Sequence, residues 1–165
     1  MTFLGFSLFF FATLPQQGHV EMPLLASQPY VGKITTTSVV QKTDMPAGYA
    51  QIALPKSLAF TFTAPSQGDW TVRLHSHYFD SYLLVHNAQG NLLRSANTEG
   101  LSRDDDGWYG LHSQVVLEGV DAGKSIQVRA VALHGKLGDF TLSVESGKAA
   151  PLSSREAEGM RLKDL

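Results

Sequence analysis

Three consecutive carboxylates, Asp104, Asp105 and Asp106, followed by Gly107, are the residues of this sequence best suited to binding a metal ion. Carboxylate oxygens are hard ligands of the kind that calcium prefers. Asp80 precedes a predicted strand that a compact β fold would bring near this run. The spacing is not that of an EF-hand, which needs alternate ligands and a distal glutamate. We therefore predict a calcium site that uses Asp80, Asp104, Asp105 and Asp106, with a solvated acidic turn as the alternative interpretation.

Aromatic side chains beside the acidic run suggest a binding surface. Trp108 and Tyr109 follow it directly, and Tyr78 belongs to the segment that leads to Asp80. Exposed aromatic rings stack on sugars or on the side chains of a partner protein. The three aromatic residues are therefore predicted to contact a polysaccharide or protein surface. In the alternative interpretation, Trp108 folds back over the edge of a sheet.

The six histidines offer a second type of metal ligand. His75 and His77 are two residues apart in a predicted strand, so they face the same side and could present two imidazoles to zinc. The sequence indicates no third ligand. A position on the surface or packing across strands is therefore the favoured interpretation for this pair, and also for His86 and His134.

Motifs for catalysis are missing from the sequence. It contains neither a Gly-x-Ser-x-Gly elbow nor a glycine-rich turn that leads into a helix and could hold phosphate. Asp80 and Asp106 could formally act as a carboxylate pair for glycoside hydrolysis, but such pairs lie in clefts that a small domain seldom forms. We predict no catalytic residue and a protein that is not an enzyme.

Composition limits the class of protein further. The 165 residues are enough for one domain with a core, and the formal net charge of -2 gives none of the positive excess that nucleic-acid binding requires. The sequence contains no cysteine, so disulfides, thiol nucleophiles and thiolate metal sites are excluded.

Both ends of the sequence differ from its middle. Residues 3–14 are apolar, too few to span a bilayer but typical of a signal peptide, and residues 1–26 are expected to be a signal peptide or apolar leader. A buried N-terminal strand or a wrongly assigned start are the alternatives, since no Lys or Arg precedes the run. We expect the protein to be secreted, periplasmic or in the cell envelope, without a membrane span in the mature chain. Residues 148–165 are expected to be a linker and the start of a helix.

The middle of the sequence has the pattern of a β protein. Apolar and polar residues alternate in short runs between turn residues, which is typical of half-buried strands. Clear runs cover residues 58–64, 70–76, 81–86, 113–118, 125–133 and 139–145, and weaker ones cover 34–40 and 91–95. The pattern predicts a single all-β domain over residues 30–147, an antiparallel, jelly-roll-like β-sandwich of about eight strands. The long irregular segment 96–111 is predicted to be a functional or metal-held loop.

Residues 58–144 resemble the pre-peptidase C-terminal domain family of bacteria. The similarity lies in the Phe-Asp-Ser-Tyr-Leu sequence of residues 79–83, in the acidic residues 104–107, and in a closing strand with Gly138, Phe140, Leu142 and Val144. Ile126 departs from the family, which usually has an aromatic residue there.

The resemblance implies a non-catalytic accessory module of a secreted protein. Such a module would bind a polymer or protein surface, or assist an attached domain. Two alternatives are the head domain of a larger envelope protein, whose helical partner is truncated at Leu165, and a small hydrolase.

Overall fold

The structure is a computed structural model, and it describes residues 21–41, 43–45, 54–93, 103–105 and 112–149, with the backbone alone for residues 103–105. Ten strands form in this part of the chain. They are β1 (Met22–Leu24), β2 (Tyr30–Ile34), β3 (Val39–Val40), β4 (Lys56–Thr63), β5 (Gly68–His75), β6 (Ser81–Asn87), β7 (Arg103–Asp105), β8 (Ser113–Val120), β9 (Ser125–Ala132) and β10 (Gly138–Ser146).

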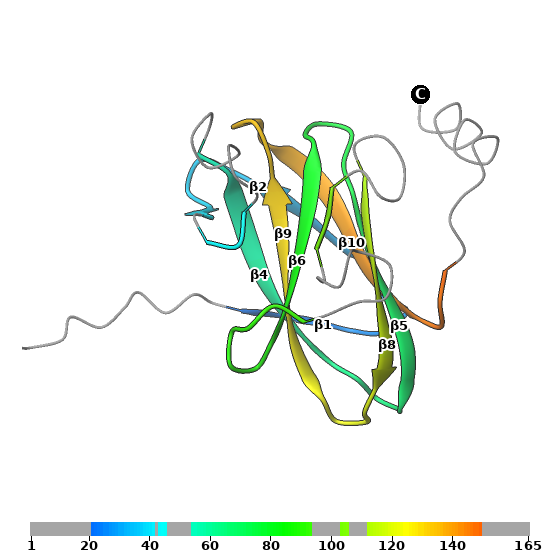
Figure 1. The fold of residues 1–165 in the computed structure, drawn as a ribbon. Coiled ribbons are helices and arrows are strands. Elements are labelled where there is room, and N and C mark those ends of the chain that lie inside the picture. Colours follow the sequence, from blue (N-terminus) through cyan, green and yellow to red (C-terminus); the bar gives the residue numbers. More distant parts are fainter. Residues whose placement is uncertain (1–20, 42, 46–53, 94–102, 106–111, 150–165) are drawn as a thin grey trace, which may run out of the picture.

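The strands form two sheets that face each other (Figure 1). One sheet has six strands in the order β1-β4-β9-β6-β7, with β3 also paired to β4, and the other has four in the order β2-β10-β5-β8. Every pair is antiparallel except β1 with β4. The predicted antiparallel β-sandwich is therefore confirmed. No helix long and apolar enough to cross a membrane occurs among the residues that the structure describes.

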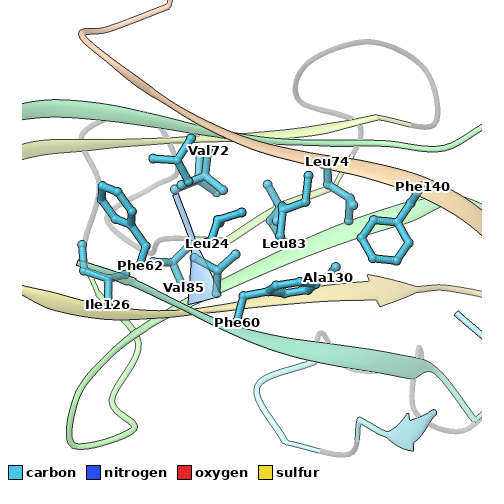
Figure 2. Packing of buried hydrophobic residues seen from close by; sticks show 14 of the residues in the cluster. Leu24, Phe60, Phe62, Val72, Leu74, Leu83, Val85, Ile126, Ala130 and Phe140 are labelled. Atoms are coloured by element: carbon cyan, nitrogen blue, oxygen red, sulfur yellow. The ribbon is translucent and has the colours of Figure 1, made fainter. Parts of the chain in front are cut away.

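The core lies between the sheets because alternate residues of each long strand point inward. Phe60 and Phe62 of β4 meet Val72 and Leu74 of β5 in one layer, as Figure 2 shows. All four side chains are fully buried. Burial of this apolar surface, at roughly 25 cal/mol per Å², is the main stabilising contribution. The sequence has no cysteine, so no disulfide adds to it.

Tight turns close the sandwich at one end. The turn after β6 is held by the Asn87 side chain, whose Oδ1 accepts hydrogen bonds from the backbone N–H groups of Gln89 (3.0 Å) and Asn91 (2.9 Å). Gly90 has a φ of 82° there, a conformation that glycine adopts at little cost. The β8–β9 turn likewise uses Gly123, with a φ of 76°. The residue types in these turns and the alternation in the strands thus indicate the same strand boundaries.

Six predicted strands are confirmed within about two residues of their bounds, but the weak run at 34–40 is not a single strand: Ile34 ends β2, Val39–Val40 form β3, and a turn lies between them. The chain turns there: the N–H of Ser38 donates to the carbonyl of Thr35 (3.1 Å), and the N–H of Thr35 donates to Ser38 Oγ (2.9 Å). Hydroxyl side chains that bond to nearby backbone favour turns over strands. The weak run at 91–95 contributes only a bridge between Leu92 and His86 within the described residues.

Three short strands were not predicted. They are β1, most of β2, and β7, which lies inside the segment predicted to be an irregular loop. In β1, Pro23 lies in a strand at the edge of the sheet, where a missing N–H is tolerated. Leu24 of β1 is 3% exposed and belongs to the core, although it falls inside the range expected to be a leader.

Candidate functional site

Tyr78 and Asp80, two of the predicted site residues, lie at the end of the sandwich opposite the tight turns. Here β5 ends, β6 and β8 begin, and β9 leads into β10. We call this the loop end, and it comprises residues 75–81, 112–113 and 133–139. The loop end brings together segments that are far apart in the sequence.

Ser76 fixes the path of the chain at the loop end. Its hydroxyl donates to the carbonyl of Asp139 (2.8 Å) and accepts from the N–H groups of Tyr78 (3.1 Å) and Phe79 (3.4 Å). Phe79 is fully buried and anchors the turn in the core, so that Tyr78 and Asp80 on either side of it are directed away from the core. The hydrogen bonds of Ser76 and the burial of Phe79 therefore hold this loop in one position.

Two serines join the sheets beneath the loop end. The hydroxyl of Ser113 on β8 donates to the carbonyl of Ser81 on β6 (2.7 Å), and the two Oγ atoms lie 2.9 Å apart. Both residues are fully buried. Their hydroxyls are engaged with each other and connect the two sheets.

Asp80 has the environment of a ligand or a charge partner. Its Oδ2 lies 3.3 Å from His134 Nε2, and its side chain is 18% exposed. Its Oδ1 is buried and has no hydrogen-bond partner among the described residues. A buried carboxylate oxygen without a partner is costly, so a bound cation or water would stabilise it.

The register of β7 brings part of the predicted acidic run towards Asp80. Asp105 pairs with Tyr82 and Asp104 with Leu83, which places the backbone of these residues beside the strand that starts just after Asp80. Asp106 lies outside the described residues. Within the described part of the chain, no three acidic, histidine or cysteine side chains are already arranged around a metal position. The predicted calcium site therefore stays a prediction.

Of the predicted surface-binding aromatics, Tyr78 lies at the loop end and is 57% exposed. It packs over Gly138: a Cβ added at that glycine would lie 2.3 Å from the Cβ of Tyr78. The glycine thus allows the loop to approach β10 closely. Trp108 and Tyr109 lie outside the described residues.

Three histidines meet on one side of the loop end. The ring centres of His75 and His77 are 4.5 Å apart, those of His75 and His112 are 3.9 Å apart, and those of His77 and His112 are 6.1 Å apart. The sequence alone did not identify His112 as a neighbour of this pair. The signal that could have found it is the antiparallel pairing of β5 with β8, in which Leu74 pairs with Ser113 and His75 and His112 come next.

The remaining described histidines have separate roles. His86 is 3% exposed, and its Nε2 lies 3.0 Å from Asp44 Oδ2 on the outer side of the six-stranded sheet. His134 contacts Asp80 and adopts a left-handed backbone conformation, with a φ of 55°.

A small pocket lies at the opposite end of the sandwich, beside the β8–β9 turn. Its volume is about 170 Å³, and its lining combines apolar side chains with the charged residues Glu118, Asp121 and Lys124. A site for catalysis on a drug-sized substrate is usually larger, at about 300 Å³ or more.

Comparison with known proteins supports the fold. No protein-family model matches the sequence, and no curated protein matches it either. Among solved structures, the chain is similar to the pre-peptidase C-terminal domain of collagenase from Bacillus anthracis, with a TM-score of 0.51 and 9% sequence identity. The match covers 78% of this chain and 98% of that domain. The predicted resemblance is therefore confirmed for the fold.

Proposed function

We propose that this chain is a non-catalytic accessory module of an exported protein, and that its loop end binds a polymer or protein surface. The observation that carries the proposal is the likeness to a pre-peptidase C-terminal domain over 98% of that domain's length. In this proposal the chain accompanies the activity of another domain and does not supply one itself.

The loop end suits this role better than the opposite end. Tyr78 presents an exposed ring beside polar groups, as aromatic residues in binding surfaces do. Ser76 and Gly138 hold the loop that carries it, so little conformational entropy is lost on binding.

A sedimentation assay tests the surface. The purified protein is mixed with insoluble collagen, peptidoglycan or cellulose, and the bound fraction is measured with and without Tyr78→Ala. We expect wild-type protein to bind at least one of these polymers, and the substitution to reduce affinity at least about tenfold, since aromatic residues at binding surfaces are frequent hot spots.

Gln89→Ala is the control for this assay, because Gln89 is exposed at the opposite end. Equal binding by wild type and Tyr78→Ala would contradict the use of the loop end. Failure of the wild type to bind any polymer would contradict the polymer-binding form of the proposal.

Calcium would stabilise the same end in this proposal. The support is the buried Oδ1 of Asp80, which has no hydrogen-bond partner among the described residues, and the pairing that brings the backbone of Asp105 beside β6. A ligand that binds only the folded state stabilises it by about 2.7 kcal/mol at a concentration one hundred times its dissociation constant.

We therefore expect calcium, added after chelator treatment, to raise the melting temperature by several degrees. Asp80→Asn, or Asp105→Ala combined with Asp106→Ala, should remove the increase, whereas Asp121→Asn at the opposite end should retain it. An unchanged melting curve in the wild type would rule out calcium stabilisation.

A further inference from the structure

The loop end carries three neighbouring histidines, His75, His77 and His112. The sequence alone had indicated only the first two as a pair that could bind a metal ion. We propose that the three together bind a divalent transition-metal ion, with zinc as the expected ion. Imidazole nitrogens suit zinc, copper and nickel, whereas calcium prefers oxygen ligands. This site is therefore chemically separate from the proposed calcium site at Asp80.

The strand pairing gives the trio a rigid base. His75 is the last residue of β5, and His112 directly precedes β8, its antiparallel neighbour. Because Leu74 pairs with Ser113, the two histidines come next to each other across the pair. His77 joins them from the bend that Ser76 holds in place. Sites built on strands are positioned more precisely than sites on free loops.

The distances between the three ring centres are close to those expected for three imidazoles bound to one metal ion. Three imidazoles bound to one zinc ion, with Zn–N distances of about 2.0–2.1 Å, have ring centres roughly 5 Å apart. The observed separations of 3.9, 4.5 and 6.1 Å lie on both sides of that value. No large movement of the backbone is therefore needed to bring the three rings around one ion.

The rings must rotate before they bind. They meet edge to face, with interplanar angles of 75–90°, so their nitrogen lone pairs do not point to one position, and the described residues contain no preformed trio. Rotation about the bond between Cβ and the ring is soft for histidine. The hydrogen bond from the N–H of Ser76 to His112 Nδ1 is long, at 3.4 Å, and its loss costs little.

Solvent reaches the trio from one side. His77 is exposed, while His75 and His112 are half-buried. Three protein ligands with a fourth position open to water is a common arrangement for zinc. An exported protein could therefore take up the ion from its surroundings after folding.

Metal titration tests the proposal. Protein without a polyhistidine tag is treated with chelator and titrated with zinc by calorimetry, and with cobalt, whose visible absorption reports a four-coordinate site. We expect one ion per chain. His77→Gln and His112→Gln should each weaken the affinity at least about tenfold, since even outer contacts of metal ligands contribute that much.

His134→Gln is the matched control, because His134 lies at the same end but outside the trio. It should bind zinc as the wild type does, and an excess of calcium should not displace zinc from either protein. His77 is exposed, so its variant should fold and decide the result even if His112→Gln is unstable. The absence of saturable binding in the wild type, or wild-type affinity in His77→Gln, would overturn the proposal, whatever the result of the Tyr78→Ala polymer assay.

Discussion

The two outer faces of the sandwich are built differently. On the four-stranded sheet, Arg73 extends along the surface, with its NH1 nitrogen 2.8 Å from Glu145 Oε2 and its Nε donating to Gln114 Oε1 (3.1 Å). On the six-stranded sheet, four side chains form a second apolar cluster with Met45 and Leu92 packed against it. They are Tyr82, Leu84, Val131 and Leu133, each no more than 2% exposed.

Polar groups on a covered face need hydrogen-bond partners within the protein, whereas polar groups on an exposed face form hydrogen bonds with water. The covered face does so in part: Gln41 Oε1 accepts from Ser57 Oγ and from an Arg129 nitrogen, both at 3.3 Å, and His86 contacts Asp44. His86 Nδ1 is buried without a partner among the described residues. Stability on this side therefore depends on a few specific contacts.

The largest effect should come from the apolar cluster of the covered face. Leu84 is fully buried, so Leu84→Ala should lower the free energy of unfolding by about 3 kcal/mol, through lost burial and the cavity that remains. Urea denaturation measures the change. Val31→Ala is the control, because Val31 is 74% exposed on β2 and should lose less than about 0.5 kcal/mol. Similar decreases in the free energy of unfolding in the two variants would contradict the view that one outer face is covered and the other exposed.

The pair of Asp44 and His86 should have an intermediate effect. Asp44→Ala removes the one described partner of a buried imidazole and places alanine at a φ of 62°, so we expect a loss of about 2 kcal/mol. Asp44→Asn should lose less, because asparagine tolerates this backbone conformation and can still form a hydrogen bond with the ring. Equal losses in the two variants would contradict a contribution from the backbone conformation and from a hydrogen bond to a neutral side chain.

The smallest effect should come from an exposed pair of the four-stranded sheet. A hydrogen bond to the Glu118 carboxylate raises the pKa of Lys148 above its ordinary value of 10.5. A raised pKa stabilises the folded state fully below the ordinary value, and this contribution is lost as the pH rises through the raised value.

Lys148→Met should therefore lower the urea midpoint only slightly at pH 7, because the Lys148 side chain is exposed and solvent screens its ion pair with Glu118. The difference should disappear in about 1 M salt, where charges are screened within about 3 Å. It should also disappear at a pH above the raised pKa. A difference that persisted in high salt would mean that Lys148 contributes through packing.

Much of the fold could be predicted because the signals for the long strands are local. Residues 58–64 and 125–133 alternate clearly, and the pairing of β4 with β9 buries one side of each. β6 is the exception: all but its last residue are buried, so its covered outer face could not be foreseen from alternation. The turn at 35–38 was missed because threonine favours strands on average, while its backbone contacts decide otherwise here.

The candidate site was less predictable, because it depends on which strands pair. Asp80 and Tyr78 are close in sequence, so their common location at the loop end follows from one turn. His112 joins His75 only through the pairing of β5 with β8, which no local pattern encodes. The backbone of Asp105 lies beside Tyr82 only through β7, a strand of three residues inside a segment without a clear strand pattern.

The position of β10 has a consequence for how the chain folds. The β10 strand lies between β2 and β5, with Leu142 opposite both Tyr30 and Leu74. During synthesis, β2 has no partner in its sheet until β10 has left the ribosome. We therefore expect folding to be slow, on the order of milliseconds to seconds, as in other sandwiches whose contacts are far apart in sequence. An emerging chain would leave the β5 edge open until β10 arrives.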